Sequence, residues 1–167
     1  LATRYDEAFL RTVIEQFDIA FEERGVLALR AQGWRASPPL VERSLPAPLN
    51  IGPLTLSSWG HSAPATGADM AVTLTWQANA PIDRQINTAF RLLDAAGNIV
   101  AQQDGPPARG IIPTNLFFAV PLPDSKPLSL PADLPPGDYQ LQVVAYDVQT
   151  VTPIGEPLMV GKLKVEG

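Results

Sequence analysis

The sequence predicts a mainly β protein, an immunoglobulin- or fibronectin-III-like sandwich of two sheets with one α-helix at its N-terminus. Two observations lead to this prediction. Segments that alternate polar and apolar residues recur along the chain, separated by turn residues at roughly 8–12-residue spacing, which is typical of a two-sheet sandwich. In addition, 18 of the 167 residues are proline and 12 are glycine, which favours many turns and few long helices.

The first predicted element is a helix over residues 3–24. Thr3 is a suitable N-cap, Arg24 closes the last turn, and Gly25 follows as the helix-ending residue. The apolar stripe along one face consists of Phe9, Val13, Phe17, Ala20 and Phe21. We expect this stripe to dock on the sandwich, on an absent part of a longer protein, or on a second copy of the chain.

Residues 26–49 are predicted to be a connector stiffened by prolines, with a short strand over residues 26–29. The expected organisation is therefore a helix with its connector over residues 1–49 and a sandwich domain over residues 50–167.

Within the sandwich, the clearest alternation is at residues 69–77, where every second side chain is apolar and is expected to face the core. These inward residues are Met70, Val72, Leu74 and Trp76. The other predicted strands cover residues 51–58, 85–93, 98–103, 126–130, 138–147 and 158–165, with brief pairing at 116–120 and a hairpin turn at 94–97.

The most informative strand follows the Leu-Pro-Pro-Gly turn at residues 134–137. Tyr139 comes just after that turn, where a tyrosine corner places the ring in the core and the hydroxyl on the preceding loop. This pattern is that of a late strand in a Greek-key sandwich.

Composition excludes several classes of function. The net charge of −5 and the scattered basic residues argue against nucleic-acid binding, which needs a clustered basic surface. The absence of cysteine rules out disulfides, thiolate nucleophiles and cysteine-based zinc sites. No apolar run reaches the roughly 18 residues of a transmembrane helix, and no signal-peptide pattern is present.

His61 is the only histidine and lies close in sequence to serines and to Asp69. No Gly-x-Ser-x-Gly motif accompanies it, so a solvated loop histidine is the favoured interpretation and a hydrolase using His61 is an alternative. A single histidine is also too few ligands for a histidine-based metal site, and no motif calls for a cofactor.

Six aspartates are predicted at strand ends or turns, where such side chains usually accept hydrogen bonds from their own backbone. They are Asp94, Asp104, Asp124, Asp133, Asp138 and Asp147. Calcium binding by these loop carboxylates is the alternative, although no Asp-x-Asp-x-Asp run is present.

Three aromatic residues are candidates for ligand binding, because exposed aromatic rings stack on sugars. Trp34 and Trp59 lie in connector or loop contexts, and Tyr146 is on the outward phase of its strand. The favoured interpretation, however, is that Trp59 caps the end of the core and Trp34 packs against the helix, since large aromatic side chains are mostly buried.

Residues 50–167 also resemble a known module, through the segments VTLTWQA (72–78), FRLLDAAGNIVAQQDGPP (90–107), Pro113-Thr114, LPADLPPGDY (130–139) and Tyr146-Asp147. Together, in this order, they are similar to the β-sandwich region after the membrane-spanning part of bacterial dolichyl-phosphate-mannose-type glycosyltransferase-like proteins of Chloroflexi type. That family tends to carry a tryptophan and a Gly-Glu pair after Pro-Thr, where this chain has Asn-Leu-Phe-Phe. The resemblance implies an accessory, extracytoplasmic module without catalytic residues.

The predicted function is therefore a non-catalytic extracytoplasmic module that contacts a protein or a glycan and is accessory to a membrane protein. A carbohydrate-binding module that stacks sugars on exposed aromatics is the first alternative, and a hydrolase using His61 is the second.

Overall fold

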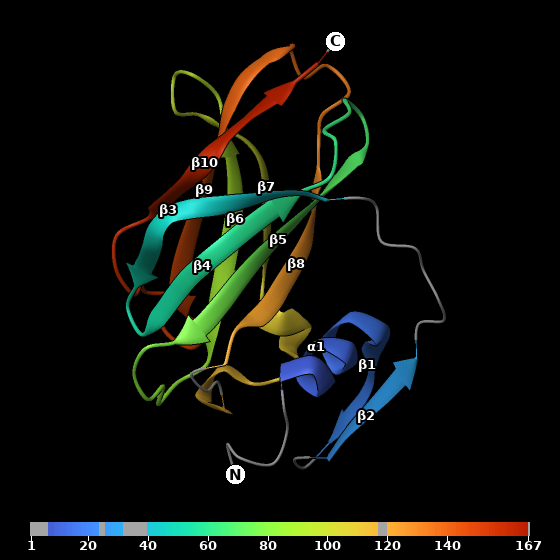
Figure 1. Ribbon diagram of the computed structural model, residues 1–167, viewed down its shortest axis with the longest axis vertical. Helices are drawn as coiled ribbons and strands as arrows, with labels where there is room; N and C mark the ends of the chain where they lie inside the picture. The colour runs from blue at the N-terminus through green and yellow to red at the C-terminus, as the bar shows by residue number, and fades with distance from the viewer. Residues whose placement is uncertain (1–6, 24–25, 32–39, 117–119, 167) are drawn as a thin grey trace.

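The computed structural model describes residues 7–23, 26–31, 40–116 and 120–166. Eight strands form two antiparallel four-stranded sheets that face each other (Figure 1). The front sheet has the order β3 (Val41–Ile51), β4 (Leu54–His61), β5 (Asp69–Ala78), β8 (Leu122–Ser129). The back sheet has the order β10 (Leu158–Val165), β9 (Gly137–Asp147), β6 (Ile86–Leu93), β7 (Ile99–Gly105). The predicted mainly β sandwich is confirmed.

The core fills the space between the two sheets, and the predicted inward residues supply it. Met70, Val72, Leu74 and Trp76 of β5 are fully buried, as are Ile86, Thr88, Phe90 and Leu92 of β6. The tyrosine corner also forms, because the buried Tyr139 donates its hydroxyl proton to the carbonyl oxygen of Pro135 over 2.7 Å. Period-two burial of this kind is what fixes strand register, since a slip of one residue would turn the apolar set outward.

The chain passes between the sheets three times: after β5, after β7 and after β8. Adjacent strands such as β3 and β4, or β9 and β10, pair as neighbours in sequence. In contrast, β5 pairs with β8 and β6 pairs with β9 across long sequence separations. Each sheet therefore combines local hairpins with one long-range pairing.

Strand boundaries differ from the prediction in the first part of the front sheet. The strand expected at residues 51–58 is divided, because Ile51 ends β3 and β4 begins at Leu54. The front sheet also includes Val41–Ile51, which mostly precedes residue 50, where the sandwich was expected to start. The register of β3 shifts between Ser44 and Leu49, so Pro46 and Pro48, two of the prolines that indicated a connector, instead lie in an irregularity of an edge strand, where a missing N–H is tolerated. The division of the chain into domains stays a prediction.

The helix prediction is wrong beyond residue 16. Helix α1 covers Glu7–Gln16, and the following residues form strand β1 (Phe17–Glu23), which pairs with β2 (Val26–Ala31). The sequence Phe-Asp-Ile-Ala-Phe-Glu alternates with period two and contains aromatic and β-branched residues, which favour a strand. The short strand predicted at residues 26–29 is confirmed within β2, whereas Thr3, Arg24 and Gly25 lie outside the described residues.

Helix α1 docks on the sandwich, as expected, but through a different residue. Ile14 is 2% exposed and belongs to the core, whereas Phe9 of the predicted stripe is 49% exposed. Arg109, in the 3-10 turn η1 (Pro107–Gly110), donates from Nη1 to the carbonyl oxygen of Ile14 over 3.4 Å. Because the last carbonyls of a helix lack intrahelical partners, this contact satisfies one of them. Of the helices described, none is long and apolar enough to span a membrane.

Candidate functional site

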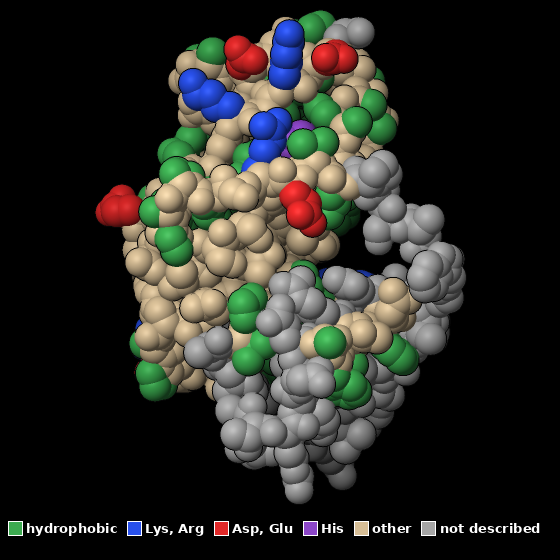
Figure 2. All heavy atoms as spheres, in the orientation of Figure 1, with side chains coloured by type: hydrophobic (Ala, Val, Ile, Leu, Met, Phe, Trp, Pro, Cys, Tyr) green, Lys and Arg blue, Asp and Glu red, His purple; other side chains and the backbone are tan. Residues whose placement is uncertain are grey.

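Two hollows lie next to each other on the outer face of the front sheet, and Leu40 lines both. The smaller hollow has a volume of about 370 Å³ and is lined mainly by polar residues of β3, β4 and β5. We call it the hydroxyl groove; its lining includes Glu42, Ser44, Ser58, Thr73, Thr75 and Pro123. Over the front sheet, Figure 2 shows mainly backbone and uncharged polar side chains, with the charged side chains concentrated toward the upper end.

Strand register explains why hydroxyls gather in this groove. Ser58 of β4 lies opposite Ser44 of β3 on one side and Thr75 of β5 on the other. Residues that face each other across a sheet point to the same side, so these three side chains share the outer face. Gly60 is the next outward residue of β4, and it is buried because β3 approaches it closely: an added Cβ would lie 3.3 Å from the carbonyl oxygen of Val41.

Several of these polar groups have no partner inside the described part of the protein. The hydroxyls of Ser44, Ser58 and Thr75 and the carboxylate of Glu42 form no side-chain hydrogen bond or ion pair there. In contrast, the hydroxyl of Thr73 is hydrogen-bonded to that of Ser125 over 2.8 Å. The groove therefore presents donors and acceptors that remain available to a bound molecule.

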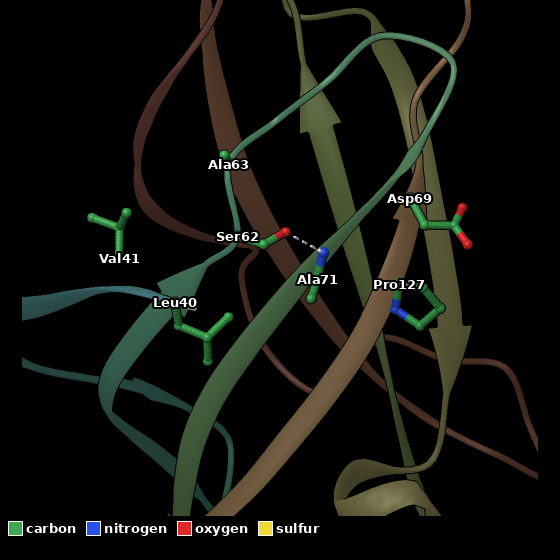
Figure 3. Close-up of a pocket in the computed structure, with 7 residues that line it drawn as sticks. All are labelled: Leu40, Val41, Ser62, Ala63, Asp69, Ala71 and Pro127. Carbon is green, nitrogen blue, oxygen red and sulfur yellow. Dashed lines mark hydrogen bonds between the residues drawn. The ribbon is translucent and has the colours of Figure 1, made fainter. Parts of the chain in front are cut away.

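The larger hollow, about 580 Å³, is more apolar and includes Leu40, Ala71 and Pro127 in its lining. Figure 3 shows Ala71 lying between Leu40 and Pro127, while the carboxylate of Asp69 points away from Ser62. The hydroxyl oxygen of Ser62 accepts the backbone N–H of Ala71 over 3.0 Å, so it is already engaged. This hollow offers fewer polar contacts than the hydroxyl groove.

Trp59 borders the hydroxyl groove, but its ring is buried. The residue is 5% exposed, belongs to the core, and stacks on His61 with ring centroids 5.4 Å apart. It also lies close to Gly161 of β10, where an added Cβ would lie 2.3 Å from the Trp59 ring. The ring thus fills the space between the two sheets, as the favoured interpretation required, and is not free to stack on a sugar.

His61 is not the solvated histidine that the sequence favoured. It is the last residue of β4, is 5% exposed and lies against Trp59. Its Nδ1 is 2.9 Å from the carbonyl oxygen of Ser62, so this nitrogen carries the proton and donates it. Among the described residues no serine hydroxyl or carboxylate is hydrogen-bonded to the ring, so the contact on which the hydrolase alternative depends is not formed there.

Tyr146 lies on the opposite side of the molecule from the groove. It is partly exposed on the outer face of the back sheet, where its hydroxyl accepts from Asn87 over 3.3 Å and donates to Asp104 over 3.4 Å. Trp34 lies outside the described residues. Tyr146 and Trp59 therefore do not form a shared aromatic surface, which the sugar-stacking alternative required of two such residues.

The predicted turn aspartates behave in two ways. Asp94 and Asp147 accept backbone N–H groups in their turns, as expected. The carboxyl pKa of Asp94 is held below its ordinary range chiefly by the hydrogen bond from the Asn98 side chain, and that of Asp147 chiefly by the hydrogen bond from the backbone N–H of Thr150. The prediction is wrong for Asp124, because this residue lies inside β8 and is 1% exposed. In the part of the chain described, no three histidine, cysteine or carboxylate residues gather in a way that could hold a metal ion.

Asp124 instead forms a buried ion pair between the two sheets. The Lys126 ammonium lies 2.7 Å from both carboxylate oxygens of Asp124 and 2.8 Å from the hydroxyl oxygen of Thr88. It also lies 4.3 Å from the centroid of the Phe90 ring. Burial holds the pKa of Lys126 below its usual range, against the opposing effect of the adjacent carboxylate.

Sequence reasoning missed both the groove and the ion pair. The sequence does indicate the ion pair, because Asp124 and Lys126 alternate in phase with Leu122 and Leu128, which are buried. An oppositely charged pair within an apolar phase indicates a buried ion pair. The sequence indicates the groove only weakly, because the pairing of the strands is needed to show that outward hydroxyls from three strands lie together.

Comparisons with known proteins include a distant likeness to solved structures. No protein-family model matches the sequence, and the search of curated proteins finds no match to it. A solved structure described as the C-terminal domain of Wzt superposes with a TM-score of 0.46 and 12% sequence identity, covering 78% of this chain and 84% of that one. At this level of likeness it says nothing about activity or ligand, and the resemblance to glycosyltransferase-like proteins stays a hypothesis.

Proposed function

We propose that this protein is a non-catalytic binding module that holds a glycan in the hydroxyl groove of its front sheet. The observation that carries the proposal is the set of unpartnered hydroxyls and the carboxylate of Glu42 that line the groove. Sugar hydroxyls both donate and accept hydrogen bonds, so a surface that offers both, placed on rigid strands, suits them.

Binding in the groove would rely on hydrogen bonds, whereas the sugar-stacking alternative relied on aromatic rings such as that of Trp59. Trp59 is among the lining residues, but it is only 5% exposed and its ring is not available for stacking. A ligand in the groove would still lie close to this indole, so binding is expected to change tryptophan fluorescence.

The location and context of the module belong to the same proposal. We place it outside the cytoplasm, as an accessory part of a membrane protein, on the resemblance of residues 50–167 to the sandwich region of glycosyltransferase-like proteins. A protein ligand in the same groove is the competing occupant.

The test is a glycan-array screen followed by titration of each positive glycan with tryptophan fluorescence as the readout. Thr75→Val removes an unpartnered hydroxyl from the groove and is expected to weaken binding at least tenfold. Thr55→Val is the matched control, because the Thr55 hydroxyl donates to Asn50 outside the groove over 2.6 Å. Urea unfolding of both variants checks that each remains folded.

Saturable binding that Thr75→Val weakens and Thr55→Val leaves intact supports the proposal. Binding that survives Thr75→Val and Glu42→Gln but is lost in Tyr146→Phe would move the site to the back sheet. The absence of binding across the whole array would overturn the glycan proposal and favour a protein ligand.

A further inference from the structure

The two hollows on the outer face of the front sheet follow each other along β5. Thr75 and Thr73 line the hydroxyl groove. The next two residues on the same face of β5, Ala71 and Asp69, line the larger hollow. At about 3.3 Å per residue, Ala71 is only about 7 Å from Thr73 along the strand. Since Leu40 lines both hollows, they adjoin on the side of β3 as well.

We call the larger hollow the apolar hollow, because most of its lining is apolar: Leu40, Val41, Ala63, Ala71 and Pro127. The two polar side chains in the lining already have partners. The hydroxyl oxygen of Ser62 accepts the backbone N–H of Ala71, and the carboxylate of Asp69 accepts the hydroxyl proton of Ser129 over 2.6 Å. The volume of about 580 Å³ lies within the range of about 300–1,000 Å³ that is usual for ligand pockets.

This lining decides between the kinds of group that could occupy the apolar hollow. A second sugar would place its hydroxyls against apolar side chains, and a peptide would place its backbone N–H and C=O groups there, at a cost in lost hydrogen bonds to water. The hydrocarbon part of an alkyl or acyl chain has no such groups and is stabilised when it leaves water for an apolar lining. The apolar hollow therefore suits a hydrocarbon chain better than a sugar or a peptide.

We infer that the ligand of the front sheet is a sugar joined to a hydrocarbon chain, with the sugar in the hydroxyl groove and the chain in the apolar hollow. The surface changes from hydroxyl to apolar between Thr73 and Ala71 of β5. Strand β8 repeats the change, because Ser125 lies opposite Thr73 and Pro127 lies opposite Ala71. An alkyl glycoside makes the same change at a single covalent bond. The inference rests on the proposed function, because that proposal assigns the sugar to the groove.

The test compares three kinds of probe by isothermal titration calorimetry, each below its micelle concentration. Methyl β-glycosides of glucose, galactose and mannose present a sugar alone, and the n-octyl β-glycosides of the same sugars add a chain. Tetraethylene glycol mono-octyl ether presents the chain without a sugar. We expect at least one octyl glycoside to bind at least tenfold more tightly than its methyl glycoside and than the ether. Its heat-capacity change on binding should also be more negative than that of the methyl glycoside, because the chain is buried.

Variants of the apolar hollow test where the chain lies. Ala71→Glu and Pro127→Glu each place a carboxylate in the hollow, so each should weaken the octyl glycoside at least tenfold and leave the methyl glycoside unchanged. Gln77→Glu is the matched control, because Gln77 is another outward residue of β5 and lines neither hollow. Thr75→Val should weaken both glycosides without affecting the ether. Urea unfolding checks that each variant remains folded.

The outcomes separate this inference from the glycan proposal. Equal affinity for the octyl and methyl glycosides overturns the inference and leaves the glycan proposal standing. A tenfold gain that survives both Ala71→Glu and Pro127→Glu also overturns it, because the chain then lies elsewhere. An ether that binds as tightly as the octyl glycosides, with no effect of Thr75→Val, overturns both, since the sugar then contributes nothing. If no octyl glycoside binds, the inference is overturned, and the glycan array alone decides the proposed function.

Discussion

Removing the Lys126 side chain is expected to destabilise the protein more than removing any other charged side chain described here. The ammonium has three oxygen partners within 2.8 Å and is 6% exposed, while its partner Asp124 is 1% exposed. Because neither group reaches solvent, solvent screening does not reduce the interaction. Lys126→Met fills a similar volume and leaves the Asp124 charge buried without its partner.

Breaking a buried pair in this way typically costs about 3–5 kcal/mol. That is a large share of the roughly 5–15 kcal/mol by which native domains are stable. Asp124→Leu should cost a similar amount, because it leaves the Lys126 ammonium buried without its partner instead. Replacing both, as Asp124→Leu with Lys126→Met, removes the uncompensated charge, so the double variant is expected to be more stable than either single variant.

The assay is urea unfolding followed by tryptophan fluorescence, since Trp59 and Trp76 are both buried and report on the core. A complete double-mutant cycle gives the coupling energy directly. If the double variant loses as much stability as the two single variants combined, the two residues do not act as a pair and the reasoning is refuted.

The same pair predicts a pH dependence whose sign follows from the lowered pKa of Lys126. Between that folded pKa and the ordinary value of 10.5, the unfolded chain holds the proton more tightly than the folded one. The free energy of unfolding is therefore expected to rise with pH through this alkaline window, relative to Lys126→Met. If the difference in free energy of unfolding between the unmodified protein and Lys126→Met does not change with pH over that window, the assignment is contradicted.

Three further predictions concern single positions. Val151 is a β-branched residue with φ of 56°, so Val151→Gly should raise the free energy of unfolding by up to about 1 kcal/mol, measured in urea. Gly161→Ala should lower it by at least about 1–3 kcal/mol, because the added Cβ would lie 2.3 Å from the Trp59 ring; a neutral result would mean that the ring can shift. The pKa of Asp94 is lowered, chiefly by the hydrogen bond from the Asn98 side chain. Its carboxylate therefore stabilises the folded protein above the ordinary pKa of 3.8, and this stabilisation is lost as the pH falls through the folded pKa. The difference in free energy of unfolding between the unmodified protein and Asp94→Ala should accordingly disappear in acid.

The fold could be predicted from the sequence where burial imposes a simple period. Strand β5 follows its alternation closely, and the Tyr139 hydroxyl bond confirms the turn that precedes β9. The helix was overextended at Phe17 because residues at positions 9, 13, 17 and 21 also match a helical spacing. Pairing with β2 decides between the two periods, and that pairing is not visible in β1 alone.

The candidate site could not be predicted in the same way. Trp59 was a candidate for sugar stacking because of its position near a loop, whereas it packs against Gly161, which follows it by 102 residues. The hydroxyl groove likewise depends on which strands become neighbours. A sequence pattern describes a single strand, whereas this site is formed by side chains of three strands.

The three passages of the chain between the sheets have a consequence for how the protein folds. Strand β8 completes the front sheet only after β6 and β7 have been laid down in the back sheet, and β9 completes its pairing with β6 only after β8. Neither sheet can finish as an independent unit, so a stable half-molecule is not expected on the way to the native state. Long-range pairings of this kind slow folding and make it cooperative, and we expect amide protons in β5, β6, β8 and β9 to exchange through one shared global opening.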